Sequence, residues 1–163
     1  LSAKHLLKNS KKLIILKAFT KLYGMAGVRL GYCLCSDTEL LARVRAAGQP
    51  WAVSSLAQAA GIAALDETEY VAKVRALIEA QRPVLADGLR ALGLRVIEGR
   101  ANYLLFRAPE ALGEALRRKG AVLRSCGNYP GLDASWYRTA VRTENENRQL
   151  LALLAETLPE VAQ

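Results

Sequence analysis

Residues 18–32 of the chain read Ala-Phe-Thr-Lys-Leu-Tyr-Gly-Met-Ala-Gly-Val-Arg-Leu-Gly-Tyr. Lys21 stands in a glycine-containing loop directly after a short apolar run, where a buried strand would hold its amine in a fixed place. Arg29 offers a planar guanidinium that suits a phosphate, and the Thr20 hydroxyl and the loop amides add neutral hydrogen-bond donors. The stretch predicts an amine beside a phosphate-binding loop. The alternative is that Lys21 is one exposed lysine among many and that Arg29 pairs with a carboxylate.

Two strands are expected to flank this loop. The apolar runs 12–17 and 28–34 have the length of buried strands. A helix follows, because Ser36-Asp-Thr-Glu39 matches a capping box, and Pro50 ends that stretch. Two strands make a poor sheet by themselves, so we interpret residues 1–65 as the end of a larger domain.

Residues 66–163 predict a long helix followed by a small α/β domain. The helix covers 66–92; Pro83 is expected to kink or divide it, and Gly93 to stop it. The pattern then reads strand, strand, helix, strand, strand, helix, at 94–97, 103–106, 109–120, 122–124, 137–141 and 144–158. The expected fold class is α/β, with a domain boundary at Leu65/Asp66.

The amino-acid composition indicates a globular protein and excludes several other classes. Of the 163 residues, 52% are hydrophobic and 23% charged, a globular balance. Three cysteines and a single histidine exclude a zinc site of standard ligand spacing. Apolar runs are too short to span a bilayer and no signal-peptide pattern is present, so we expect a cytoplasmic protein. The chain begins at Leu1 rather than methionine, which suggests a piece of something longer.

Positive charge is concentrated near the N-terminus. The net charge is +8, and residues 1–50 hold nine basic and two acidic side chains. Such a patch attracts nucleic acid, a phosphorylated ligand or an acidic protein surface. Nucleic acid is the less favoured partner, because only Phe19, Tyr23 and Tyr32 lie among these basic residues and no nucleic-acid motif is present.

A second group of chemistry-bearing residues lies toward the C-terminus. Arg124 and Arg138 are fourteen residues apart, on predicted strands either side of one loop. Their guanidinium groups can converge on one phosphate or carboxylate, with paired donors that lysine would not provide. The alternative is that both lie on solvated strand edges.

The lysine stretch resembles the cofactor-lysine motif of fold-type-I pyridoxal-phosphate enzymes, in the class I/II aminotransferase superfamily. Thr20-Lys21 and the run Gly-Val-Arg-Leu-Gly-Tyr at 27–32 match the family pattern. Ala18 departs from it, since the family carries a hydroxyl three residues before the lysine; the lost hydrogen bond is worth about 1 kcal/mol. The resemblance implies that Lys21 carries pyridoxal 5'-phosphate as a Schiff base and that Thr20 and Arg29 bind its phosphate.

The C-terminal stretch resembles the branch that contains histidinol-phosphate aminotransferase and threonine-phosphate decarboxylase. The resemblance implies that Arg124 and Arg138 bind the anionic end of the substrate. It also places Asn102, followed by Tyr103, on a strand that lines the small domain among the substrate-binding residues. Arg142 stands where the aminotransferases of this branch usually have glycine. The resemblance at this position therefore favours the decarboxylase over the aminotransferase.

The resemblance extends over the whole chain but only over the C-terminal half of the family's length. It implies that residues 1–65 are the remnant of the large cofactor-binding domain and that 66–163 form the small substrate-binding domain. The family segments that pair with the cofactor ring nitrogen and stack on the ring would be missing. We therefore expect this chain alone to be inactive, and the missing N-terminal half and a second subunit of a homodimer to be its partners.

The expected activity is that of an aminotransferase acting on a phosphorylated or dianionic amino compound, histidinol-phosphate aminotransferase-like. Decarboxylation of threonine phosphate, a step of cobalamin synthesis, is the alternative. From another class, the chain could be a non-catalytic basic module that binds phosphate or nucleic acid, and a third possibility is a folded fragment without activity. Residues 1–65 are expected to expose apolar surface, whereas Trp51 and Trp136 are expected to be packing residues.

Overall fold

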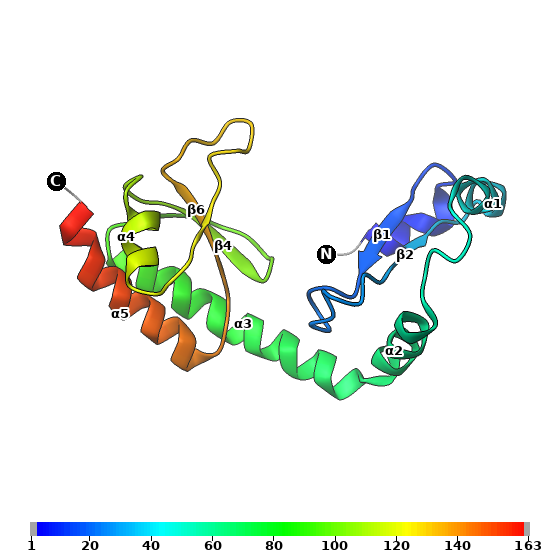
Figure 1. Ribbon diagram of the computed structural model, residues 1–163, viewed down its shortest axis with the longest axis horizontal. Coiled ribbons are helices and arrows are strands. Elements are labelled where there is room, and N and C mark those ends of the chain that lie inside the picture. The colour runs from blue at the N-terminus through cyan, green and yellow to red at the C-terminus, as the bar shows by residue number, and fades with distance from the viewer. Residues whose placement is uncertain (1–2, 162–163) are drawn as a thin grey trace. The chain divides into compact units, whose positions relative to one another are not determined.

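The computed structural model describes residues 3–161. Contacts divide the chain into two compact units, Leu1–Ala72 and Lys73–Gln163, and the division falls inside one long helix (Figure 1). The sequence pattern places the boundary seven residues earlier, at Leu65/Asp66. None of the helices in the described part of the chain has the length and apolar character needed to cross a membrane.

The first unit contains one antiparallel strand pair. Strands β1 (Ile15–Ala18) and β2 (Gly31–Leu34) pair from Ile15 opposite Leu34 to Ala18 opposite Gly31. Both expected strands are present, but β1 begins three residues later and ends one residue later than the run 12–17, and β2 begins three residues later than the run 28–34. The expectation that these strands are buried is wrong, because β1 is mostly exposed and β2 is only partly covered. The other elements of this unit are a 3₁₀ helix, η1 (Ala3–Asn9), and the helices α1 (Thr38–Ala47) and α2 (Ser55–Asp66).

The cap of α1 differs from the expected capping box. Asp37, not Ser36, is the N-cap, and its carboxylate accepts a hydrogen bond of 2.9 Å from the Leu40 amide. The Ser36 hydroxyl instead donates to the Ser10 carbonyl at 3.0 Å. The helix therefore begins one residue later than the capping-box pattern indicates.

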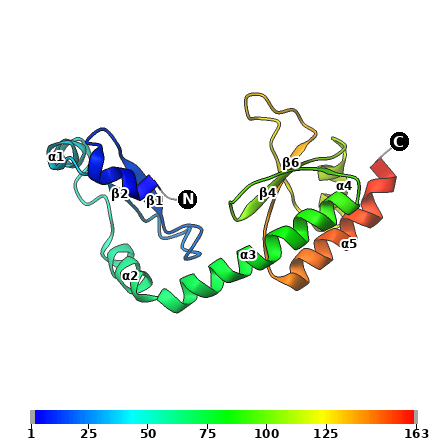
Figure 2. The same ribbon diagram turned by 180° about the vertical axis from the view of Figure 1, so that it is seen from behind.

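The second unit follows the predicted order of elements. After α3 (Thr68–Ala91) come β3 (Arg95–Ile97), β4 (Tyr103–Arg107), α4 (Leu112–Arg118), β5 (Arg124–Ser125), β6 (Trp136–Ala140) and α5 (Glu144–Val161). The four strands form one antiparallel sheet in the order β3-β4-β6-β5. Figures 1 and 2 show α3 and α5 side by side. The Leu151 side chain of α5 lies against Gly88 of α3, where a side chain on residue 88 would collide with it.

One face of this sheet is the core of the second unit. Leu104, Phe106, Tyr137 and Thr139 alternate along β4 and β6 and are all buried. Leucines of the three helices cover them: Leu85 and Leu89 of α3, Leu112 and Leu116 of α4, and Leu154 of α5. The alternate residues of the strands face away from this core, and among them are Arg124 and Arg138.

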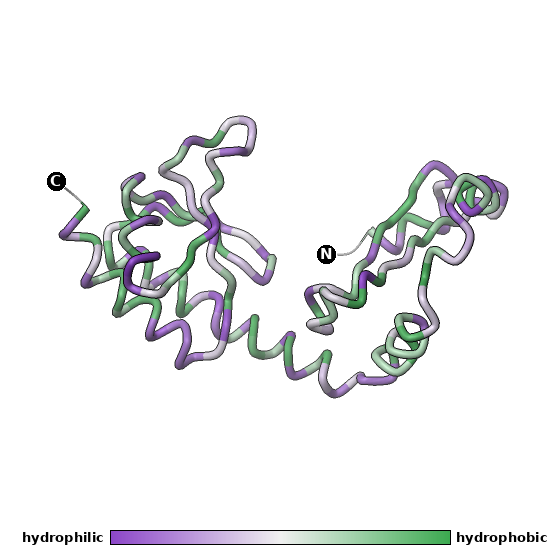
Figure 3. The backbone as a smooth tube through the Cα atoms, in the orientation of Figure 1, coloured by the Kyte–Doolittle hydropathy of each residue, from purple (hydrophilic) through white to green (hydrophobic). Residues whose placement is uncertain are grey.

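The first unit has much less core. Within the described residues, three of the 18 buried hydrophobic residues belong to it, namely Phe19, Ala57 and Ala64, whereas it holds eleven of the 15 exposed large hydrophobic ones. Hydrophobic colour follows α2 in Figure 3, and Leu56 and Ile62 on this helix are 85% and 68% exposed. The expectation of exposed apolar surface is confirmed. The packing role expected for Trp51 is wrong, because its side chain is 97% exposed.

Two prolines lie inside helices. α3 continues through Pro83 to Ala91, so Pro83 does not divide the helix, and a kink there, the other outcome expected, stays a prediction. Pro159 lies inside α5, which passes the expected end at Leu158. Both helices pack apolar residues against the core near the proline: Leu85 and Leu89 of α3 are buried, and Leu158 of α5 is partly buried. Tertiary packing offsets the local cost of the missing amide donor. Gly93, with φ of +78°, ends α3 as predicted.

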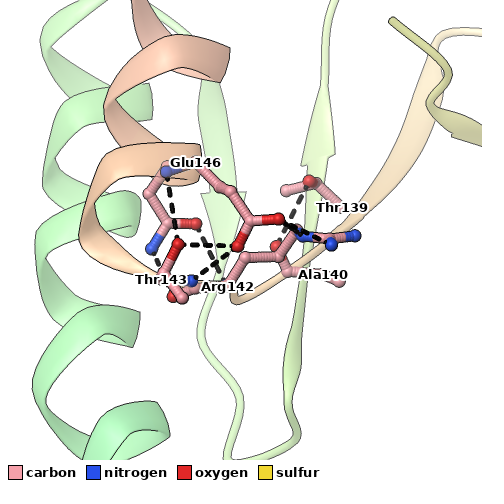
Figure 4. A network of polar contacts seen from close by, with 6 residues as sticks. Thr139, Ala140, Arg142, Thr143 and Glu146 are labelled. Atoms are coloured by element: carbon pink, nitrogen blue, oxygen red, sulfur yellow. Dashed lines mark hydrogen bonds and ion pairs between the residues drawn. The ribbon is translucent and has the colours of Figure 1, made fainter. Parts of the chain in front are cut away.

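A polar network fixes the start of α5 (Figure 4). Thr143 and Glu146 form a capping box: the Thr143 amide donates to the Glu146 carboxylate at 3.2 Å, and the Glu146 amide donates to the Thr143 hydroxyl at 3.4 Å. The Thr143 hydroxyl also donates to that carboxylate, at 2.6 Å. The Arg142 guanidinium donates to the same carboxylate at 2.7 Å. These contacts, the Thr143 hydroxyl first and Arg142 next, lower the pKa of Glu146 from 4.5 to about 2.

Replacing Glu146 should therefore destabilise the second unit in a pH-dependent way. A carboxyl whose pKa is lowered by folding stabilises the fold above its ordinary pKa, and that contribution disappears as the pH falls through the lowered value. We expect Glu146→Gln to lower the melting temperature at pH 7, and the difference from the parent chain to shrink between pH 4.5 and pH 2. Thermal unfolding across this range measures it. Glu79→Gln is the matched control, since Glu79 is an exposed α3 residue without a hydrogen bond or ion pair in the described chain. If the melting temperatures of both variants followed the same pH dependence, the lowered pKa of Glu146 would be contradicted.

Candidate functional site

Lys21 lies in the closed loop that joins β1 to β2. The Phe19 amide donates to the Leu30 carbonyl at 3.1 Å, which extends the strand pairing to the base of the loop. Inside the loop, the Gly24 amide donates to the Lys21 carbonyl and the Met25 amide to the Phe19 carbonyl, both at 3.3 Å. Lys21 itself is exposed. The loop therefore presents an accessible amine on a backbone that is fixed at both ends.

Phe19 anchors this loop to the rest of the first unit. Its side chain is 4% exposed, and its ring stacks on Tyr23 at 5.1 Å and meets the edge of Tyr32 at 5.8 Å between centroids. An ideal Cβ on Gly61 of α2 would lie 2.4 Å from the Leu30 side chain and 3.8 Å from the Phe19 ring. The glycine thus lets α2 approach the loop closely.

Arg29 occupies a strained position on the same loop. Its φ is +55°, in the left-handed region that residues other than glycine rarely adopt. Its guanidinium is exposed and donates to the Ala26 carbonyl at 3.2 Å. Backbone strain of this kind concentrates at functional sites, where the surrounding structure holds a side chain in a required place. The structure thus gathers Thr20, Lys21 and Arg29 on one hairpin loop.

Arg124 and Arg138 meet on the second unit's sheet. They are direct partners in the antiparallel pairing of β5 with β6, so both side chains start from the same face of the sheet. Like charges placed directly opposite repel, and neither guanidinium has a hydrogen bond or ion pair among the described residues. Two arginines at paired positions, without a carboxylate partner among the described residues, form a site that an anion would stabilise.

A hollow of about 630 Å³ opens beside Arg124, and Arg138 is not among its lining residues. Arg117, Arg124, Ser125 and Asn128 are among its lining residues. Guanidinium, hydroxyl and amide groups all donate hydrogen bonds, so this lining suits an anionic ligand.

The loop between β5 and β6 is fixed by contacts that the sequence analysis missed. Arg107 donates to the Ser135 hydroxyl at 2.8 Å, and its guanidinium lies 3.7 Å from the Asp133 carboxylate. The Ser135 hydroxyl and amide both donate to Asp133 and, hydroxyl first, lower the pKa of that carboxyl. The Cys126 amide closes the loop on the Trp136 carbonyl at 2.8 Å. The Asp-Ala-Ser pattern at 133–135 is a turn signal that could have indicated this arrangement.

Asn102 and Arg142 have different surroundings. The Asn102 carbonyl accepts the Val141 amide at 2.9 Å, which prolongs the β4–β6 pairing by one residue, and its side chain is exposed. Arg142 is engaged by Glu146 at the start of α5. Its ion pair gives Arg142 a structural role that does not depend on the substrate.

Comparison with known proteins shows the family to which this chain belongs. The family model described as aminotransferase class I and II matches residues 2–154. The chain belongs to this family. Family members use pyridoxal phosphate, and one matched structure, histidinol-phosphate aminotransferase from Sinorhizobium meliloti, was solved in complex with pyridoxal-5'-phosphate (TM-score 0.72, 25% identity, covering 93% of this chain and 41% of that one).

Two enzyme activities occur among the related sequences. Threonine-phosphate decarboxylase of Salmonella typhimurium is 37% identical over 160 residues, which cover 96% of this chain and 44% of the relative. Histidinol-phosphate aminotransferase of Symbiobacterium thermophilum is 38% identical over 158 residues, covering 95% and 43%. The chain thus spans less than half the length of these relatives.

Solved structures of aminotransferases also resemble this chain. Histidinol-phosphate aminotransferase from Clostridium acetobutylicum matches with a TM-score of 0.92 and 31% identity, covering 98% of this chain and 49% of that one. The fold is therefore a partial aminotransferase fold.

The residues of the lysine loop fit the family's cofactor by their chemistry. An accessible primary amine suits an aldehyde carbon, and the Arg29 guanidinium and Thr20 hydroxyl are donors that suit a phosphate. An added Cβ at Gly24 or Gly27 would meet no atom within 4 Å, so space is open along the loop.

Two glycines of the 27–32 run should respond differently to substitution. A Cβ at Gly31 would lie 2.8 Å from the Lys17 carbonyl oxygen, a backbone atom that can move only if β1 and β2 separate, whereas Gly27 faces open space. We expect Gly31→Ala to cost about 1–3 kcal/mol of hairpin stability and to accelerate amide hydrogen exchange in both strands. Gly27→Ala is the matched control and should leave exchange unchanged. Equal exchange rates in the two variants would contradict this account of the hairpin.

Proposed function

We propose that this chain is the part of a pyridoxal-phosphate-dependent enzyme that carries the cofactor lysine and the arginines for the substrate anion. The observation that carries the proposal is the closed β1–β2 loop, which holds Lys21 and Arg29 together within a family that uses this cofactor. Residues 1–65 are assigned to the cofactor domain and residues 66–163 to the substrate domain.

Each residue has a defined task in this proposal. The bound cofactor supplies an electron sink for charge that develops on the substrate's α-carbon. Lys21 would hold the cofactor through Nζ, a primary amine that suits its aldehyde group, and as the free amine would take up and return a proton at the substrate's α-carbon. Arg29 and Thr20 hold the phosphate, while Arg124, Arg138 and Asn102 hold the far end of the substrate. By holding the far end of the substrate, these residues would set the orientation of its α-carbon and thereby which of its bonds breaks.

The substrate proposed is a phosphorylated or dianionic amino compound. Two arginines at directly paired positions of β5 and β6, without an acidic partner in the described chain, match a dianion better than a single carboxylate. Histidinol-phosphate aminotransferase-like chemistry is the first choice, and threonine-phosphate decarboxylation is the second. Relatives with the two activities are 38% and 37% identical, and Arg142 no longer favours the second, because Glu146 engages its side chain.

The proposed partners are the remaining length of the enzyme and a second subunit. Leu16, Trp51, Leu56 and Ile62 are more than two-thirds exposed, and a unit with so few buried apolar residues needs a covering surface. The excess of positive charge in residues 1–50 favours an acidic covering surface.

A basic nucleic-acid-binding module is the candidate from another class. The exposed lysines of the first unit favour it, but the aromatic residues among them do not. Phe19 is buried and Tyr23 stacks on it, so of these three rings Tyr32, which is 39% exposed and meets Phe19 edge-on, is the one left for stacking on a base. DNA binding that falls steeply with salt and does not depend on Lys21 would support this alternative.

Covalent labelling tests the proposed role of Lys21. The chain is incubated with pyridoxal 5'-phosphate, reduced with borohydride and digested, and the modified lysines are located by peptide mass mapping. We expect modification concentrated at Lys21, because its loop also supplies the phosphate-binding donors. Lys21→Ala should lose this label, whereas Lys17→Ala, which removes an exposed lysine of the adjoining strand β1, should keep it. Labelling spread evenly over the lysines would contradict the assignment.

A further inference from the structure

Arg124 lies on the edge strand of the second unit's sheet, away from the ring that Arg138 contacts. The Arg138 guanidinium carbon lies 4.8 Å from the centroid of the Tyr103 ring on β4, whereas Arg124 belongs to β5, on the other side of β6. The Arg124 guanidinium makes no hydrogen bond or ion pair among the described residues, and Arg124 lines the hollow of about 630 Å³. Its donors are therefore available to a ligand in that hollow.

A second arginine, Arg117 of α4, lines the same hollow. Its backbone is fixed at the end of the helix, because its carbonyl accepts the Gly120 amide at 3.0 Å. Its Nε lies 3.8 Å from the Glu114 carboxylate, too far for a hydrogen bond, and the two side chains are 67% and 65% exposed. An exposed ion pair of this kind contributes little free energy in water. The Arg117 guanidinium thus keeps its N–H donors for another ligand.

The other residues that line the hollow add donors but no negative charge. The Asn128 amide group and the Ser125 hydroxyl donate no hydrogen bond within the described chain, and none of the lining residues is acidic. Asn128 is held in a turn, where the Tyr129 amide donates to the Cys126 carbonyl at 3.0 Å. A sphere with the volume of this hollow is about 11 Å across. An anion near its centre is therefore within the Debye length of about 8 Å of the charges in its lining.

We propose that Arg117 is a further residue for binding the substrate anion, and that Arg117 and Arg124 hold a phosphate group in this hollow. The inference rests on the proposed function, which assigns Arg124 to the substrate anion, and it extends that site to α4. Two guanidinium groups match the double charge of a phosphate monoester better than the single charge of a carboxylate. Ser125 and Asn128 supply neutral donors, and Val122, which is 74% exposed, offers an apolar contact to the organic part of the ligand.

Phosphate titration of the full chain tests the role of Arg117. The backbone amide resonances of Ser125, Gly127 and Asn128 are followed by NMR at constant ionic strength while inorganic phosphate is added. We expect these resonances to shift, and Arg117→Gln to weaken phosphate binding at least about fivefold, because hydrogen bonds to a charged group are lost. Arg118→Gln is the matched control. It removes the same charge from the next residue of α4, which is also exposed but does not line the hollow, and it should keep the parent affinity.

Arg124→Gln separates failure of the inference from failure of the proposed function. If the parent chain does not bind phosphate, or if Arg124→Gln binds it as tightly as the parent, the assignment of Arg124 to the substrate anion is contradicted and the role of Arg117 falls with it. If Arg124→Gln weakens binding but Arg117→Gln does not, only the inference is overturned. Equal weakening in Arg117→Gln and Arg118→Gln would be an effect of net charge alone and also overturns it, as do phosphate-induced shifts that spare the amides of the hollow.

Discussion

Pairing of β1 with β2 is the constraint on which the lysine loop depends. The ladder ends at Ala18 opposite Gly31, and one further hydrogen bond, from the Phe19 amide to the Leu30 carbonyl, closes the loop that carries Lys21 and Arg29. Strain at Arg29 persists because both ends of the loop are fixed. Without this closure the two side chains would belong to a flexible segment, and no common ligand could be expected to bind them.

The two units are stabilised in different ways. The second has an apolar core between its sheet and three helices, so the surface that bears Arg124 and Arg138 rests on a rigid base. The first relies on the strand pair and on Phe19, and most of its large apolar side chains are exposed. This contrast is consistent with a chain that spans less than half the length of its relatives.

Sequence reasoning succeeded where a signal is local. The spacing of Lys21 and Arg29 pointed to one loop, and hydrophobic periodicity gave the correct order of elements in the second unit. It failed where distant residues decide the outcome. Pro159 does not end α5, because leucines near it pack against the core, and Trp51 is 97% exposed although a packing role was expected.

The arrangement of the arginines is a further property that distant contacts determine. Their spacing in the sequence suggested convergence, but only the register of β5 against β6 makes Arg124 and Arg138 direct partners. The contact between Tyr103 and Arg138 depends on the register of β4 against β6 in the same way. Side-chain pairs across strands have no fixed sequence separation, so a single sequence cannot reveal them.

The central claim is that one hairpin loop supplies both the amine and the phosphate-binding donors. The most direct test compares the affinity of the chain for pyridoxal 5'-phosphate with its affinity for pyridoxal, which has the same aldehyde but no phosphate, by visible absorbance titration. We expect the phosphorylated compound to bind at least about tenfold more tightly, since hydrogen bonds to a charged group are worth about 1.5–3 kcal/mol, and Arg29→Gln to remove most of this preference. Equal affinity for the two aldehydes, or a preference that survives Arg29→Gln unchanged, would contradict the claim.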